Sequence, residues 1–156
     1  MLITNHVLQG ALLGRAVRRP LPALVVGAVS HLVADALPHW GDIHAQVHEA
    51  AFLRVAVPDG LAGLALLTAV ARATPPTARP AVVAGMVGAC LPDLDKPWAL
   101  VVRRAGPWPA AFDRLHRAVQ REAAHRLPLE VALAGALALA VAAVHRLSGL
   151  AAERRG

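Results

Sequence analysis

The sequence predicts an all-α protein, a small multi-pass membrane helical bundle that forms one domain over residues 1–156. Three observations support this prediction. Hydrophobic residues make up 56% of the chain and charged residues only 17%, whereas a typical soluble domain is about 45–50% apolar and 25% charged. The apolar residues also form long runs with no strand-like alternation. This composition excludes a disordered chain, and the single cysteine, Cys90, excludes a disulfide scaffold.

Four apolar stretches are long enough to cross, or nearly cross, a hydrocarbon core, which takes about 20 residues of helix. They are residues 21–37, 50–71, 81–102 and 127–144. Small residues recur within them, as in the Gly85-x-x-Gly88 pair, and let membrane helices approach one another closely. We therefore expect about four spanning helices, with a soluble alanine-rich bundle as the alternative.

Two weaker helices complete the predicted set. Residues 5–17 are apolar but short, so we expect a helix that is re-entrant or packed against the others. Residues 110–126 are amphipathic, because Phe112, Leu115 and Val119 share one stripe and arginines lie beside it. Such a pattern is typical of an interfacial helix.

The charge pattern favours a lipid bilayer, and no nucleic acid, as the partner. The net charge is +6, and nearly all of the positive charge is arginine, with Lys96 as the single lysine. The arginines form short clusters between apolar stretches, which is how charge flanks membrane segments. Tyrosine is absent and phenylalanine is rare, so no aromatic platform for stacking bases accompanies the charge.

Histidine and aspartate side chains lie inside or at the edges of the apolar runs. If successive helices alternate in direction, these residues converge on one side of the membrane although they are scattered along the chain. The converging residues are His6, His31, Asp35, His39, Asp59, Asp93, Asp95 and His116. An aspartate at the centre of a membrane helix costs about 2.5–3.5 kcal/mol, and the usual compensations are mutual pairing, a water-filled cavity or a metal ion.

The spacing in the first long stretch supports a metal site. His31, Asp35 and His39 are four residues apart, so they share one helical face. Histidine and carboxylate ligands suit zinc, manganese or iron, and we expect a divalent metal with zinc as the first candidate. Two alternatives stay open: His31 and Asp35 as a simple buried pair, and the aspartates after Pro92 as a capping or turn device.

Several motifs resemble those of the small bacterial membrane-bound metal-dependent hydrolases. They are Thr4-Asn5-His6 followed by Gly10 and Gly14, Ser30-His31-x-x-x-Asp35-x-x-Pro38-His39-Trp40, Leu91-Pro92-Asp93-Leu94-Asp95 and Leu115-His116-Arg117. The resemblance implies a multi-pass protein of the bacterial inner (plasma) membrane. It also implies six candidate metal ligands or catalytic groups: His6, His31, Asp35, Asp93, Asp95 and His116. The chain departs from the family at Lys96, where the family carries a histidine.

The residues lead to one main function hypothesis and two alternatives. The main hypothesis is a metal-dependent hydrolase in the membrane that acts on an amphiphilic phosphoester such as a phospholipid or isoprenoid phosphate. A bound metal would lower the pKa of a water toward about 7, Asp59 or Asp35 would serve as general base, and Arg117 would hold the phosphate with Arg103 or Arg104. The alternatives are a non-hydrolytic metal-binding or proton-coupled membrane protein, with an oligomer required for a full transporter, and a structural scaffold.

Overall fold

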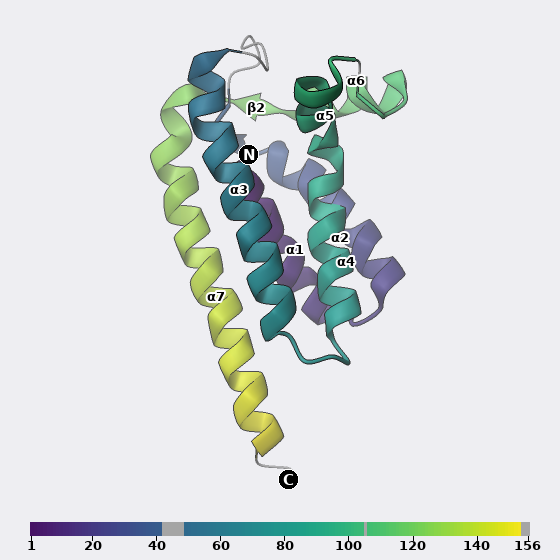
Figure 1. Ribbon diagram of the computed structural model, residues 1–156, viewed down its shortest axis with the longest axis vertical. Helices are drawn as coiled ribbons and strands as arrows, with labels where there is room; N and C mark the ends of the chain where they lie inside the picture. Colours follow the sequence, from purple (N-terminus) through teal and green to yellow (C-terminus); the bar gives the residue numbers. More distant parts are fainter. Residues whose placement is uncertain (42–48, 105, 154–156) are drawn as a thin grey trace.

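The protein, described here from a computed structural model, is α-helical over most of its length (Figure 1). The structure describes residues 1–41, 49–104 and 106–153. The bundle helices are α1 (Ile3–Val17), α2 (Pro20–Asp35), α3 (Ala50–Ala73), α4 (Arg79–Cys90) and α7 (Leu127–Glu153). The remaining elements are β1 (Pro38–His39), η1 (Leu91–Leu94), α5 (Asp95–Val102), α6 (Ala110–Val119), β2 (Arg121–Glu122) and η2 (Ala124–Arg126). The all-α class is therefore confirmed, with a minimal strand pair that the sequence did not predict.

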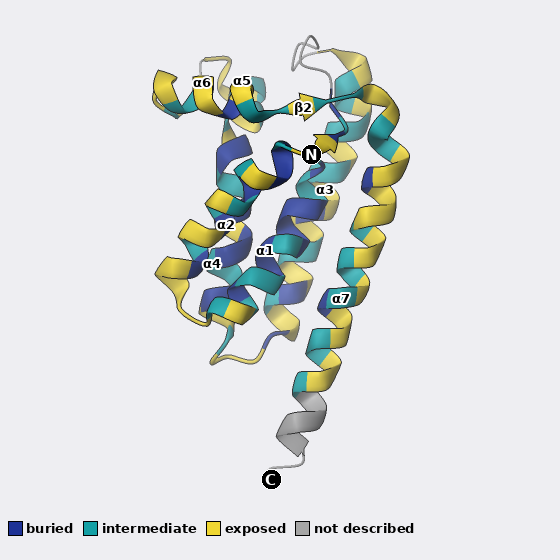
Figure 2. Ribbon diagram, turned by 180° about the vertical axis from the view of Figure 1, so that it is seen from behind, coloured by how far each residue is buried: buried dark blue, intermediate teal, exposed yellow. Residues whose placement is uncertain are grey.

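The tightest packing joins α1, α2 and α4, and it depends on glycine. A Cβ atom added at Gly10 of α1 would collide with the backbone of Gly85 on α4, and a Cβ at Gly85 would collide with Gly10 in return. Gly88 of α4 lies equally close to the backbone of Leu24 on α2. These helices therefore approach almost backbone to backbone, as expected for small residues at helix contacts. Figure 2 shows the buried face of α1 at the centre of this group.

Helices α3 and α7 pack on the outside of this group, and few of their described residues are buried (Figure 2). Within the part of the chain that the structure describes, these are the two helices long and apolar enough to cross a membrane. Their side chains toward the core, such as Val70 and Val141, join the hydrophobic cluster around Val7 and Met86. Large apolar side chains on their other faces, such as Leu64 and Leu139, are exposed.

The prediction of four spanning helices is wrong for the described residues. Helix α2 covers 16 residues and so falls short of the 20 or so that a full span takes. The stretch of residues 81–102 divides into α4, the 3₁₀ turn η1 and α5. Pro92 explains the division, because proline has no N–H to donate and its ring clashes with the carbonyl four residues earlier.

The N-terminus of α1 is held by carboxylates from both peripheral helices. Asp59 of α3 accepts hydrogen bonds from the backbone N–H groups of Ile3 (2.6 Å) and Thr4 (3.2 Å). The buried Glu130 of α7 accepts from the N–H of Leu2 (2.8 Å) and from the side chain of Asn5 (2.9 Å). Free N–H groups and the helix dipole both favour negative charge at this end. The short first helix is thus packed between the others.

A cap of short elements covers the end of the bundle at which α2 ends (Figure 1). The predicted interfacial helix is shorter than expected, because α6 ends at Val119 and the chain then continues as β2. Strand β2 pairs in parallel with β1, with His39 opposite Glu122. The N–H of Ala123 also donates to the carbonyl of His39 (2.8 Å). This pairing ties the segment after α6 to the segment after α2.

Candidate metal centre

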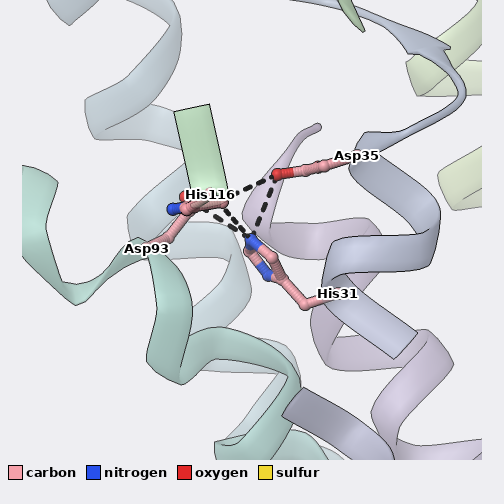
Figure 3. Close-up of side chains that lie close together, drawn as sticks. All are labelled: His31, Asp35, Asp93 and His116. Carbon is pink, nitrogen blue, oxygen red and sulfur yellow. Dashed lines mark hydrogen bonds and ion pairs between the residues drawn. The ribbon is translucent and has the colours of Figure 1, made fainter. Parts of the chain in front are cut away.

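Four buried side chains from three elements meet beneath the cap (Figure 3). Helix α2 supplies His31 and Asp35, η1 supplies Asp93 and α6 supplies His116. One potential ligand atom from each lies within 4.8 Å of those of the other three. The i, i+4 spacing places the first two on one turn of α2, as predicted, and tertiary contacts bring the other two to them.

The distances within the cluster fit a single metal ion. Nε2 of His31 lies 3.0 Å from Nε2 of His116 and 3.1 Å from Oδ2 of Asp35. Oδ1 of Asp93 lies 3.6 Å and 3.7 Å from the same two nitrogens. Ligands at the usual zinc distances in a tetrahedron would be separated by about 3.3–3.4 Å. The observed separations bracket this value, and no two of the four ligand atoms lie more than 4.8 Å apart, so the group can close around one ion.

The hydrogen bond on the far side of the His31 ring orients its free nitrogen. The Nδ1–H of His31 donates to the carbonyl of Ala89 at 2.7 Å, so in the neutral ring Nε2 carries the lone pair. Metal-binding histidines commonly use a backbone carbonyl in this way to fix tautomer and ring plane. A second imidazole nitrogen, Nε2 of His116, lies 3.0 Å from Nε2 of His31. Either a proton on Nε2 of His116 or a metal ion between the two nitrogens makes this contact favourable.

Both carboxyl groups of the cluster are held in the ionised form. Burial acts to raise the pKa of Asp35, but the ring nitrogens of His116, His31 and His6 around its two oxygens outweigh burial and lower that pKa far below its usual range. Burial also acts to raise the pKa of Asp93, but the charge of Lys96 lowers it. Two buried carboxylates beside histidine nitrogens form a site that attracts a cation.

Lys96 is the neighbouring cation on the chain. Its Nζ lies 2.6 Å from Oδ1 of Asp93. Burial acts to lower the pKa of Lys96, but the charge and hydrogen bond of Asp93 raise it above its usual value. The side chain is therefore an ammonium, and it faces the same carboxylate oxygen as the histidines do.

The other predicted site residues lie at different distances from this cluster. His6 adjoins it, because its ring stacks on His31 with centroids 3.9 Å apart and its Nε2 lies 3.3 Å from Oδ1 of Asp35. Asp95 begins α5, outside the four-residue group. Asp59 caps α1 with both carboxylate oxygens. Arg117 is exposed on α6. The roles of Asp59 as base and of Arg117 as phosphate ligand stay predictions.

Two residues of the site were missing from the six predicted ligands or catalytic groups. His39 is fully buried with Nε2 3.8 Å from Oδ1 of Asp35. Its i, i+4 spacing from Asp35 was the available signal, although the chain leaves the helix before His39 and reaches the site as β1. Lys96 stood out only as a departure from the family, and its i, i+3 spacing from Asp93 was the available signal.

An apolar cavity of about 460 Å³ adjoins the cluster. Its walls come mainly from α3 and α5 and from the segment around Trp40, with Phe52, Val57 and Leu100 among the lining side chains. The charged side chains of Asp59, Asp93, Lys96 and Glu122 also line it. The cavity therefore offers an amphiphilic molecule apolar walls and a charged part, in which Lys96 is the cationic side chain.

Comparison with known proteins leaves the chain without a demonstrated family. No protein-family model matches the sequence, and neither a curated protein nor a solved structure matches it.

Proposed function

We propose that this protein is a membrane-embedded, metal-dependent hydrolase that cleaves an amphiphilic phosphoester. The observation that carries the proposal is the buried group of His31, Asp35, Asp93 and His116, whose ligand atoms all lie within 4.8 Å of one another. The adjoining apolar cavity, with Asp93 and Lys96 on its wall, supports an amphiphilic substrate. Zinc is the first candidate for the metal, with manganese and iron as alternatives, because two imidazoles and two carboxylates suit all three.

The surface of the bundle supports a location in the bilayer. In addition to α3 and α7, helix α2 exposes a row of large apolar side chains four residues apart, namely Leu21, Val25, Val29 and Val33. Its opposite face buries small and polar residues such as Gly27 and His31. A helix with its large apolar side chains outward and its polar side chains inward is suited to a lipid environment. Contact with lipid would cover apolar surface that water would leave exposed.

The residues of the chain divide the chemical tasks between them. A metal ion held by the cluster would polarise a phosphoryl oxygen and generate a nucleophile from water at neutral pH. Lys96, as an ammonium beside the cavity, would bind the phosphate group as a point charge. The apolar walls would hold the tail of the substrate and exclude water from the charged end. We retain Arg117 as an additional phosphate ligand in this proposal, provided by α6.

The resemblance to the small bacterial membrane-bound metal-dependent hydrolases fits this proposal. Its strongest motifs contain His31, Asp35 and Asp93, which lie together in the cluster, and its weaker motif contains His116. We propose membership of that family, location in the inner membrane and hydrolytic activity together.

A second candidate is a non-hydrolytic metal-binding or proton-coupled membrane protein. The contact between Lys96 and Asp93 favours it, because an internal ammonium can occupy the place of a second cation beside the carboxylate. This candidate predicts a bound metal or proton without product release.

Metal content is the deciding measurement. We expect the purified full chain in detergent to carry at least one divalent ion, and the Asp93→Asn variant to lose it while keeping its helical content. A metal-free wild-type protein would overturn the proposal. If the metal is present, a panel of phospholipids and isoprenoid phosphates tests hydrolysis, and a metal-bound protein that releases no phosphate or alcohol from any of them supports the second candidate.

A further inference from the structure

The two oxygens of Asp35 face different pairs of histidines. Oδ2 lies 3.1 Å from Nε2 of His31 and 3.2 Å from Nε2 of His116, within the four-residue candidate metal centre. Oδ1 faces the other way, with Nε2 of His6 at 3.3 Å and Nε2 of His39 at 3.8 Å. A carboxylate with imidazole nitrogens gathered at both of its oxygens has the arrangement of a bridging ligand.

The histidines at Oδ1 have free nitrogens that are aimed inward. Among the described residues, Nε2 of His39 and both ring nitrogens of His6 are buried without a hydrogen-bond partner. Both side chains are fully buried. Leaving a buried polar group unpaired costs about 1–3 kcal/mol, so two unpaired Nε2 atoms near one carboxylate oxygen require an explanation. A bound cation would remove the penalty at both Nε2 atoms.

In His39, as in His31, the ring nitrogen that points away from Asp35 is hydrogen-bonded to a backbone carbonyl. Its Nδ1–H donates to the backbone carbonyl of Leu37 at 2.8 Å, which leaves the lone pair on Nε2 toward Asp35. The ring of His6 is fixed by stacking on His31 at an angle of 18° between the planes. Both nitrogens are thus held in position by the fold before any ion binds.

We propose that a second divalent cation binds between Nε2 of His6, Nε2 of His39 and Oδ1 of Asp35, so that Asp35 bridges two metal ions. The α-amino group of Met1 lies 3.1 Å from the same Oδ1, which indicates that a positive charge is favourable at this position. The second ion takes the place of that ammonium as the partner of Oδ1. Two imidazoles and a carboxylate oxygen leave at least one coordination position for an exogenous ligand.

This inference rests on the proposed function and deepens it. Paired metal ions about 3.5–4 Å apart act together on phosphate esters, because they stabilise both the attacking and the leaving oxygen. A pair bridged by Asp35 would therefore allow the site to stabilise both of these oxygens in the phosphoester that the proposed function assigns as substrate.

The experiment counts metal ions in the full-length protein in detergent after loading with zinc and removal of the excess. We expect two ions per chain in the wild type and one in His39→Asn. The asparagine amide can still donate to the carbonyl of Leu37 but has no atom in the position of Nε2. His31→Asn should also lose one ion, from the other site. The matched control is His145→Asn, because His145 contacts Thr74 and the backbone of Val141 instead of the cluster, and it should keep both ions.

Manganese loading provides a measurement that needs no variant. Two carboxylate-bridged manganese ions give an exchange-coupled paramagnetic resonance signal, whereas a single ion gives an isolated one. One isolated ion per wild-type chain, together with unchanged metal content in His39→Asn, would overturn the second site and leave the proposed function intact. A wild-type chain that binds no ion would overturn both. If His39→Asn fails to fold, which thermal unfolding reports, the wild-type count and spectrum still decide.

Discussion

Nε2 of His31 lies 3.0 Å from Nε2 of His116, although 85 positions separate the two residues in the chain. The first nitrogen is positioned by a hydrogen bond from the same ring to Ala89 of α4, and the second is brought in by α6. The strand pair β1–β2 holds the end of α6 against the segment after α2. The candidate metal centre is therefore assembled from the bundle and its cap, and each can be perturbed separately.

Replacing Lys96 should separate metal binding from phosphate binding. In Lys96→Met the ammonium no longer competes for Oδ1 of Asp93, so we expect divalent metal to bind roughly tenfold more tightly. Binding of inorganic phosphate to the metal-loaded protein should weaken, because the cation beside the cavity is gone. Both constants can be measured by titration calorimetry. The control is Arg72→Met, which removes an exposed charge in the last turn of α3. Weaker metal binding in Lys96→Met would contradict this account of Lys96.

The metal-free protein should lose stability as the pH falls from about 6.5 to about 4. Burial lowers the pKa of His6 to about 4 from its usual value of 6.5. Between these values the unfolded chain binds a proton that the folded chain excludes, so the free energy of unfolding rises with pH and falls as acid is added. The full effect is about 3 kcal/mol for a shift of this size. Chemical unfolding of chelator-treated protein across this range measures it.

The matched variant for the pH prediction is His6→Asn, which has no titrating group at this position. Its stability should depend less on pH between about 4 and 6.5 than that of the wild type. Equal slopes for the two proteins would show that another group accounts for the loss.

Glycine substitutions should have opposite effects in the core and on the outside of the bundle. Gly85→Ala places a Cβ against the backbone of Gly10, so we expect it to destabilise the protein by about 1–3 kcal/mol. Gly135→Ala meets no atom within 4 Å, and alanine is the better helix former, so it should stabilise by up to about 1 kcal/mol. Thermal unfolding in detergent compares the two. A neutral Gly85→Ala would disprove the close contact of α1 and α4.

A lysine on the outer face of α7 should reveal whether lipid covers that face. Leu139 is 74% exposed, so in water Leu139→Lys would be tolerated. At the centre of a membrane helix it should cost about 2.5–3.5 kcal/mol. Val101→Lys is the control, because Val101 is 79% exposed but lies on α5 in the cap. Membrane fractionation of cells producing each variant gives the answer, and equal membrane-bound amounts would argue against α7 as a span.

Local sequence patterns predicted the helices but not how far each one extends. The apolar runs that form α3 and α7 were identified because a long run of apolar residues produces a long helix whichever helices pack beside it. The run at residues 81–102 looked equally continuous, yet it divides at Pro92, where the 3₁₀ turn aims Asp93 into the site. Whether one proline divides a helix depends on what the turn at that proline packs against. Composition does not predict that packing.

The sequence likewise predicted some residues of the candidate site but not the whole set. His31 and Asp35 were found from their helical spacing, and His116 and Asp93 were placed at the same end of the bundle by alternating the helix directions. Asp95 was included with Asp93 because the two are neighbours in a motif, but the structure brings only Asp93 into the four-residue group. His39 was on the predicted face and was still left out of the ligand set.

By itself, the sequence determined that the chain is helical, largely apolar and rich in histidine and aspartate where such residues are costly. Composition and helical period determine these properties because they act over a few residues at a time. Only the tertiary structure decided which atoms meet. Oδ2 of Asp35 faces His31 and His116, and Oδ1 faces His6 and His39. The pairs with His31 and His39 follow from i, i+4 spacing, but the contacts with His6 of α1 and His116 of α6 are set by close glycine packing and by the cap, so no local pattern contains them.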